Sequence, residues 1–163
     1  MTQKPVLLIL NVGDGGNDRS VEVQDYSHRR TAVVVLKGRL EAEIAQLDPA
    51  DAAEFLSEYD IDEPGLNRAV RLAYDLLGLM SFFTVGEDEV RAWTVDRGAS
   101  AVGAAGAIHT DLQRGFIRAE VIGYQDMIDS GTMAVARAKG LLRLEGRDYV
   151  VLDGDIVNIR FNI

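Results

Sequence analysis

Two short runs of apolar residues stand out in the first part of the chain. One is PVLLILN, from Pro5 to Asn11, which leads into a segment rich in glycine and aspartate; the other is TAVVVL, from Thr31 to Leu36. Continuous apolar runs of this length are typical of strands buried on both faces of a parallel sheet. A crossover helix between them would fall within residues 21–30. The pattern therefore predicts a β–α–β unit, whose two strands are too few to form a stable sheet alone.

Helical periodicity replaces this pattern from about residue 40. Apolar residues three or four positions apart predict a short helix from Leu40 to Leu47. Asp48 precedes a proline, which is typical of a helix start because aspartate caps free N–H groups and proline fits the first turn. A second helix is therefore expected over 49–58. A third is expected from Pro64 to Leu77, with its apolar positions along one side.

Short strands dominate the pattern after Met80. Segments 82–85 and 90–95 predict a hairpin around a polar turn. A run of small residues over 99–107 predicts a helix packed closely on a sheet, and further strands are expected at 115–122, 149–152 and 156–161. The order strand–strand–helix–strand–helix–strand is typical of a small α+β domain, for which β-grasp is the natural topology.

The segment from Gly115 to Ile122 alternates with period two. In a strand, alternate side chains point to opposite faces. The prediction is one face carrying Phe116, Arg118, Glu120 and Ile122, and an opposite face carrying Ile117, Ala119 and Val121.

The composition is that of an ordinary globular protein of 163 residues, 47% hydrophobic and 26% charged. The absence of cysteine excludes disulfides and thiolate metal sites and favours a cytosolic compartment. No apolar run approaches the ~20 residues that a membrane span needs. The net charge of −9 argues against nucleic-acid binding. Eight of the nine basic residues in 80–163 are nevertheless arginine, whose planar guanidinium suits phosphate.

No complete catalytic motif is present. A P-loop needs Gly-x4-Gly-Lys-Ser/Thr, and this string occurs nowhere in the chain. Hydrolysis by this chain alone is therefore not expected, and the glycine-rich segment after Asn11 is interpreted as a turn. His28 and His109 are too isolated for a metal site. His109 and Asp111 would suit a general base and its orienting acid, but helix capping with a backbone hydrogen bond explains the same residues more simply.

Four residues in the second half are candidates for nucleic-acid contact. Arg91 and Trp93 lie on one predicted strand, where the indole would either stack on a base or fill a small core. Arg114 and Arg118 lie close together in the sequence, where they would form either a phosphate-binding spot or a solvated surface.

Several strings in this half resemble one family. The TGS domain of the YchF/Obg-like ATPases has the same strings in the same order and spacing as residues 82–86 and 89–94 (FFTVG, EVRAWT) and as residues 104–106, 108–111 and 115–121 (AAG, IHTD, GFIRAEV). Its ending is similar to residues 146–151 and 153–156 (GRDYVV, DGDI). The resemblance is continuous from about residue 40 to the end.

The resemblance implies two domains. Residues 1–79 would be the C-terminal remnant of a P-loop nucleotide-binding domain with a helical linker, and residues 80–163 a TGS domain, a small ubiquitin-like β-grasp module. The expected fold class is α+β: a β-grasp TGS domain preceded by a helical segment and a two-strand remnant of a parallel α/β nucleotide-binding domain. The family's P-loop, switch regions and helical arm lie upstream of this chain, which would then be a fragment or a truncated form.

The resemblance also implies a function. The family's Asn-x-x-Glu base-reading motif would fall on Asn11 and Asp14, with ATP or GTP and Mg²⁺ bound by the full-length parent and no cofactor held by this chain alone. The implied role is a cytoplasmic RNA- or ribosome-contacting regulatory module, with RNA or the large ribosomal subunit as partner. Its candidate contacts would be Arg91, Trp93, Arg114 and Arg118.

Two alternatives stay open. One is nucleotide hydrolysis by the full-length parent, with Asn11 and Asp14 reading the base. The other is a protein–protein or small-effector module without RNA contact, which the net charge favours. A homodimer through the incomplete sheet at 5–37 is a further prediction, because unpaired strand edges tend to associate.

Overall fold

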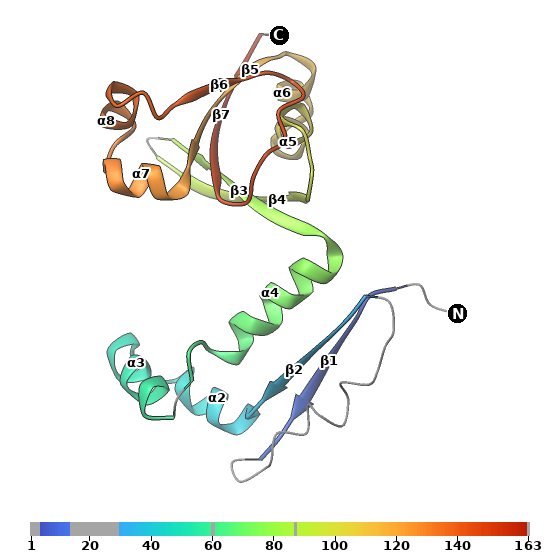
Figure 1. Cartoon of the computed structure of the whole chain (residues 1–163), viewed down its shortest axis with the longest axis vertical. Coiled ribbons are helices and arrows are strands. Elements are labelled where there is room, and N and C mark those ends of the chain that lie inside the picture. Colours follow the sequence, from blue (N-terminus) through green and yellow to red (C-terminus); the bar gives the residue numbers. More distant parts are fainter. Residues whose placement is uncertain (1–3, 14–29, 60, 87, 163) are drawn as a thin grey trace. The chain divides into compact units, whose positions relative to one another are not determined.

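The computed structural model describes residues 4–13, 30–59, 61–86 and 88–162. The chain divides into two compact units, Met1–Leu77 and Gly78–Ile163. Helices and strands are mixed throughout (Figure 1), which confirms the α+β class. None of the helices in the described ranges is long and apolar enough to cross a membrane.

The first unit combines two strands with three helices. Strands β1 (Val6–Asn11) and β2 (Thr31–Leu36) are parallel, as predicted, with Val6 opposite Thr31 and Asn11 opposite Leu36. The helices are α2 (Gly38–Ile44), α3 (Pro49–Glu58) and α4 (Gly65–Leu77). All three lie within a few residues of the predicted ranges. The helix predicted within 21–30 falls almost entirely on residues outside the described ones.

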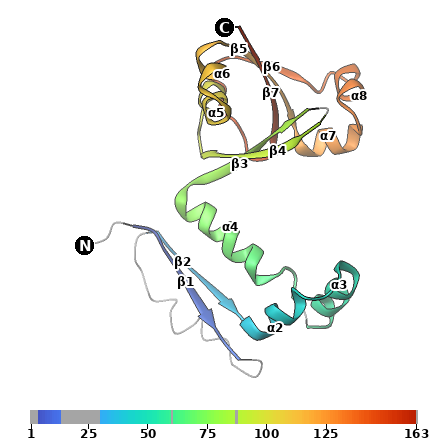
Figure 2. The same ribbon diagram turned by 180° about the vertical axis from the view of Figure 1, so that it is seen from behind.

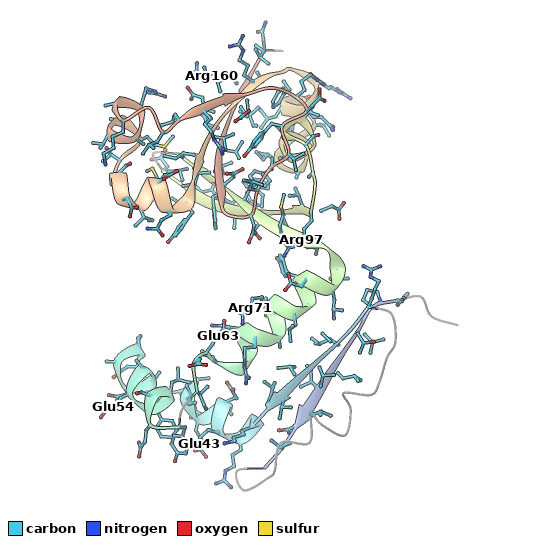
Figure 3. All side chains as sticks on the ribbon, in the orientation of Figure 1. Glu43, Glu54, Glu63, Arg71, Arg97 and Arg160 are labelled. Atoms are coloured by element: carbon cyan, nitrogen blue, oxygen red, sulfur yellow. The ribbon has the colours of Figure 1, made fainter. Side chains whose placement is uncertain are left out.

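Side-chain contacts fix the start of α3 and the position of α4 in this unit. Asp48 accepts hydrogen bonds from the N–H groups of Ala50 and Asp51 at 3.0 and 3.1 Å, so the predicted cap of α3 is confirmed. Helix α4 is attached to β2, because the Arg68 guanidinium donates to the Val35 carbonyl at 3.2 Å. Near the start of α4, Arg71 forms an ion pair with Glu63 at 2.6 Å (Figure 3).

The second unit is built on a five-stranded mixed sheet. Its strand order is β4-β3-β7-β5-β6. The strands are β3 (Leu79–Val85), β4 (Val90–Asp96), β5 (Phe116–Gly123), β6 (Arg143–Glu145) and β7 (Asp155–Phe161). β3 is antiparallel to β4 and parallel to β7, and β5 is antiparallel to both β7 and β6. The first and last strands of the unit are therefore neighbours at its centre, as in a β-grasp sheet.

Helices cover both faces of this sheet, as Figures 1 and 2 show from opposite sides. They are α5 (Ala101–Ile108), α6 (Thr110–Arg114), α7 (Tyr124–Ser130) and α8 (Met133–Ala138). On one face, fully buried Ala101, Ala104 and Ala105 of α5 pack with Phe82 and Val121. On the other, buried Ile122, Ile156 and Ala136 form a smaller cluster that includes α8. Small side chains let α5 approach the sheet closely, as the sequence predicted.

A β-bulge in β5 overturns the predicted alternation. The register with β7 shifts between Phe116 and Arg118, so Ile117 is an extra residue without a partner. Phe116 consequently joins Ala119 and Val121 in the core under α5, whereas Ile117 is exposed. The prediction that Phe116 shares a face with Arg118 is therefore wrong, because a bulge resets the period-two pattern at one position.

The predicted strand at 149–152 is also corrected. Its backbone forms one isolated bridge, between Val150 and Ser100, and no regular strand. The strand that pairs with the outer edge of β5 is instead β6, Arg143–Glu145. With three residues, β6 is too short to show an alternating pattern in the sequence.

Candidate functional site

Asn11 is the last residue of β1, and its side chain contacts the start of α2. Its Oδ1 atom accepts a hydrogen bond from the Gly38 N–H at 3.0 Å. A Cβ atom at Gly38 would lie 2.7 Å from that oxygen, so a larger residue there would displace the Asn11 side chain. The structure thus gives the Asn11 side chain a positioning contact at the carboxyl end of a parallel strand. Asp14 lies outside the described residues, and base recognition by this pair stays a prediction.

The structure separates the four candidate contact residues. Arg91 and Trp93 lie on β4, and Arg118 lies on β5, which are separated in the sheet by β3 and β7. Trp93 packs against the core under α5, whereas Arg118 belongs to the opposite face with Glu120. Arg114 ends the short helix α6 and lies 3.9 Å from Asp111. These four side chains do not form one patch.

Trp93 is held in place by two neighbours. Its indole N–H donates to the Thr84 hydroxyl at 2.9 Å, and the Arg91 guanidinium lies 4.3 Å from the centre of its ring. The indole is half-buried and packs against the core. Cation–π contact holds the arginine over one face of the ring. Trp93 therefore acts as part of the core of this unit.

Two arginines that the sequence did not single out contact Glu120. This carboxylate accepts hydrogen bonds from Arg160 at 2.8 Å, from Asn158 at 3.2 Å and from Arg137 at 3.3 Å. Arg118 lies directly opposite Arg160 in the β5–β7 ladder. Directly opposite side chains point to the same face of a sheet. We call Arg118, Arg137 and Arg160 the arginine face.

Glu120 is the buried centre of the arginine face. Its side chain is 8% exposed, whereas the Arg160 side chain is 58% exposed. The hydrogen bond from Arg160 lowers the pKa of Glu120 below its ordinary value, despite the opposing effect of burial. Arg137 and Arg160 both contact the one carboxylate, and Arg118 adds a third positive charge opposite Arg160 in the ladder. Such a surface attracts anions on a chain whose net charge is −9.

Two members of the arginine face, Arg137 and Arg160, could not be identified from the sequence. Arg137 lies on α8, in a part of the chain where the predicted order includes a helix but the apolar pattern gave no bounds for it. Arg160 is recognisable as a neighbour of Arg118 only once the register of β7 against β5 is known. The position of Arg118 beside them also depends on the bulge at Ile117.

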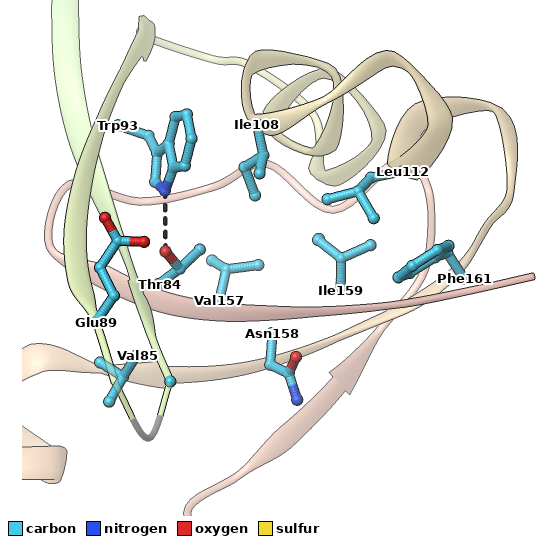
Figure 4. A pocket seen from close by; sticks show the side chains of 11 residues that line it. Thr84, Val85, Glu89, Trp93, Ile108, Leu112, Val157, Asn158, Ile159 and Phe161 are labelled. Carbon is cyan, nitrogen blue, oxygen red and sulfur yellow. Dashed lines mark hydrogen bonds between the residues drawn. The ribbon is translucent and has the colours of Figure 1, made fainter.

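A cleft lies between β7 and the end of β3. It has a volume of about 360 Å³. Its apolar wall comprises Ile108, Leu112, Val157, Ile159 and Phe161 (Figure 4). Thr84, Val85, Gly86, Glu89, Trp93 and Asn158 complete the lining. The cleft is therefore apolar along β7 and acidic at the β3–β4 hairpin.

Two polar clusters have structural roles. His109 accepts a hydrogen bond from the Asp111 N–H at its Nδ1 atom, 3.2 Å away, and so caps α6. Tyr149 donates its hydroxyl proton to buried Asp155 at 2.8 Å. Burial, together with the carboxylate of Asp155, raises the pKa of Tyr149 to about 12.

In the described part of the chain, no group of three or more His, Cys, Asp or Glu side chains is arranged to hold a metal ion.

Comparison with known proteins gives consistent matches. Residues 79–162 match the family model YchF-GTPase_C, described as a protein of unknown function (DUF933). The chain is 43% identical over 170 residues to the ribosome-binding ATPase YchF of Bacillus subtilis and 47% identical over 167 residues to that of Haemophilus influenzae. In both cases the alignment covers 100% of this chain and 46% of the relative.

A solved structure shows the same fold. The Schizosaccharomyces pombe YchF GTPase superposes with a TM-score of 0.82 and 29% identity, over 96% of this chain and 43% of that chain. The likeness includes both compact units. The chain spans about half the length of the relatives it matches.

Proposed function

The chain belongs to the YchF-GTPase_C family, and on that premise we propose that it is the C-terminal part of a ribosome-associated, nucleotide-binding factor. The names of its relatives support ribosome association. Within this chain, the second unit would be the contacting module. Hydrolysis of ATP or GTP with Mg²⁺ would belong to the full-length parent, because the chain itself has no P-loop sequence.

The arginine face is the observation that best supports RNA contact. Ribosomal RNA presents phosphate groups, and arginine binds phosphate through two parallel N–H donors. Arg137 and Arg160 are more than half exposed, although both contact Glu120. Each guanidinium therefore retains donors for a second anion. The Glu120 Oε1 atom accepts from both guanidinium groups and so holds them near one point, which reduces the entropy lost on binding.

A ribosome pelleting assay tests this function. Replacing Arg118 and Arg160 by Glu is expected to weaken binding of the chain to ribosomes by at least tenfold and to reduce the dependence of affinity on salt, because each lost phosphate contact lowers that dependence by about one unit. Arg39→Glu is the matched control, since Arg39 is an exposed arginine on the first unit. Equal pelleting of all variants would exclude the arginine face as the contact.

Two of the four candidates from the sequence, Arg91 and Arg114, lie outside the arginine face. Arg91→Glu and Arg114→Glu test them in the same assay. Loss of binding in these variants, with retention in Arg118→Glu, would transfer the contact to β4 and α6. Trp93 is less suitable for substitution, because its indole packs against the core.

The alternative of a protein or small-effector module without RNA contact is supported by the net charge of −9. Crosslinking to ribosomal RNA in cells separates it from the first proposal.

A dimer through β1 and β2 also stays a proposal. It is supported by the exposure of Ile9 and Leu66 in the first unit, since apolar surface of this kind favours association. Sedimentation of the chain with Ile9→Lys tests the dimer.

A further inference from the structure

The last residues of strand β7 have one edge that no strand of the described residues pairs with. Along its length it pairs with β5 on one side. On the other side, within the described residues, it pairs with β3 at a single position, Phe83 opposite Ile156. Strand β3 ends at Val85, so the last residues of β7 continue beyond it.

The direction of the backbone groups on β7 follows from its pairing with β5. Asn162 donates its N–H to the Gly115 carbonyl at 2.9 Å, toward β5. In an antiparallel ladder, successive residues direct their N–H and C=O groups to opposite sides. Phe161 and Ile159 consequently direct theirs away from β5. These groups face the side of β7 on which the cleft lies.

The cleft provides side-chain contacts beside this edge. Ile108 and Leu112, from α5 and α6, form an apolar wall over Ile159 and Phe161 (Figure 4). Phe161 is nearly half exposed, so its ring is available to a ligand. Backbone donors and acceptors beside alternate apolar sites are the requirements of an added β-strand.

The charge at one end of the cleft restricts the ligand. Glu89 lines the cleft, and Asp88 is exposed beside it in the hairpin turn. Neither residue has an arginine or lysine partner among the ion pairs of the described residues. A basic side chain entering at this end would be attracted, whereas an acidic one would be repelled.

We propose that the cleft between β3 and β7 binds an extended peptide segment of a protein partner, which adds a strand to the free edge of β7 at Ile159 and Phe161. The segment has apolar residues at alternate positions and a lysine or arginine beside Glu89. The inference is independent of RNA contact, because Arg118, Arg137 and Arg160 are not among the residues that line the cleft.

Selection from a random library of ten-residue peptides against the full chain, followed by NMR with a synthetic representative, tests the proposal. Enriched peptides are expected to show alternate apolar positions with a basic residue, and to shift the amide signals of Ile159, Phe161 and Val85. N-methylation of alternate peptide residues, on the side that faces β7, is expected to weaken binding at least tenfold. N-methylation of the intervening residues is expected to have little effect.

Variants of the chain provide the second measurement. Ile159→Pro removes a free N–H without removing a hydrogen bond to β5, and is expected to reduce affinity about tenfold. Leu112→Lys places a charge on the apolar wall, and Ile128→Lys is its control, because Ile128 is an exposed residue of α7 outside the cleft. The N-methyl series uses the unmodified chain and therefore decides the question even where a variant fails to fold.

Three outcomes would overturn the proposal. They are the absence of enriched peptides, amide shifts confined to the arginine face, and equal affinity of both N-methyl series. Concentration-dependent dimerisation that removes the same amide signals in the free chain would assign the edge to a second copy instead.

Discussion

Glu41 caps a helix that begins twenty-four residues later in the chain. Both oxygens of its carboxylate accept the N–H of Gly65 at 2.8 Å, at the first residue of α4. The N–H groups at the start of a helix have no partner within it and carry partial positive charge, so a carboxylate stabilises them. This contact fixes the start of α4 against α2.

We expect Gly65→Ala to destabilise the first unit by about 1–3 kcal/mol. A Cβ atom at residue 65 would overlap a Leu36 methyl group and the Glu41 carboxylate. The Leu36 and Glu41 side chains would therefore have to shift, which weakens the cap of α4 and its packing on β2. Gly146→Ala is the control, since a Cβ atom there would have nothing within 4 Å. Urea unfolding, followed by hydrogen exchange of the α4 amides, measures the difference. Equal stability of the two variants would contradict the close packing.

Glu41→Ala is expected to cost about 1 kcal/mol, as for loss of a helix cap. Glu43→Ala removes a neighbouring carboxylate on the same helix, whose ion pair with Arg39 is exposed. Exposed pairs of this type contribute little, so its cost should stay below about 0.5 kcal/mol. Thermal unfolding of the two variants compares them directly. An equal loss in both would show that Glu41 acts through its charge alone.

The sequence was sufficient for elements that depend on local signals. Asp48 and the following proline start α3, and the third helix ends as its apolar pattern does. Local patterns do not contain information about pairing between distant strands. The arginine face depends on the register of Arg160 against Arg118, forty-two residues apart, and the cleft depends on where β3 stops pairing with β7. The resemblance to a known family gave the fold class without giving either surface.

Two substitutions distinguish a bulged β5 from a regularly alternating strand. Regular alternation would place Ile117 and Ala119 on the same face, whereas the structure exposes Ile117 and buries Ala119 completely. Ile117→Lys should therefore change stability by less than about 0.5 kcal/mol. Ala119→Lys should prevent folding of the second unit, because it would bury an unpaired charge under α5. Circular dichroism and thermal unfolding distinguish them, and similar behaviour of both variants would contradict the bulge.

The carboxylate of Glu120 is expected to make stability depend on pH. Its pKa is lowered in the folded chain, first by the hydrogen bond from Arg160, so its contribution is present above its ordinary value of 4.5 and is lost as pH falls through the lowered pKa. Glu120→Gln should cost about 1 kcal/mol at pH 7, since the arginines are largely exposed and solvent screens them. The difference between the unmodified chain and the variant should shrink as the pH is lowered below 4.5.

Arg160→Ala completes this experiment as a double-mutant cycle. The substitution should cost less in the Glu120→Gln background than in the unmodified chain, because the ion pair at 2.8 Å is already absent there. Urea unfolding at pH 7 and at a pH below the lowered pKa of Glu120 measures the coupling, which should be smaller at the lower pH because protonation of Glu120 removes the ion pair. A coupling that is the same at both values would mean that Arg160 stabilises the sheet by packing, and that the carboxylate does not organise the arginine face.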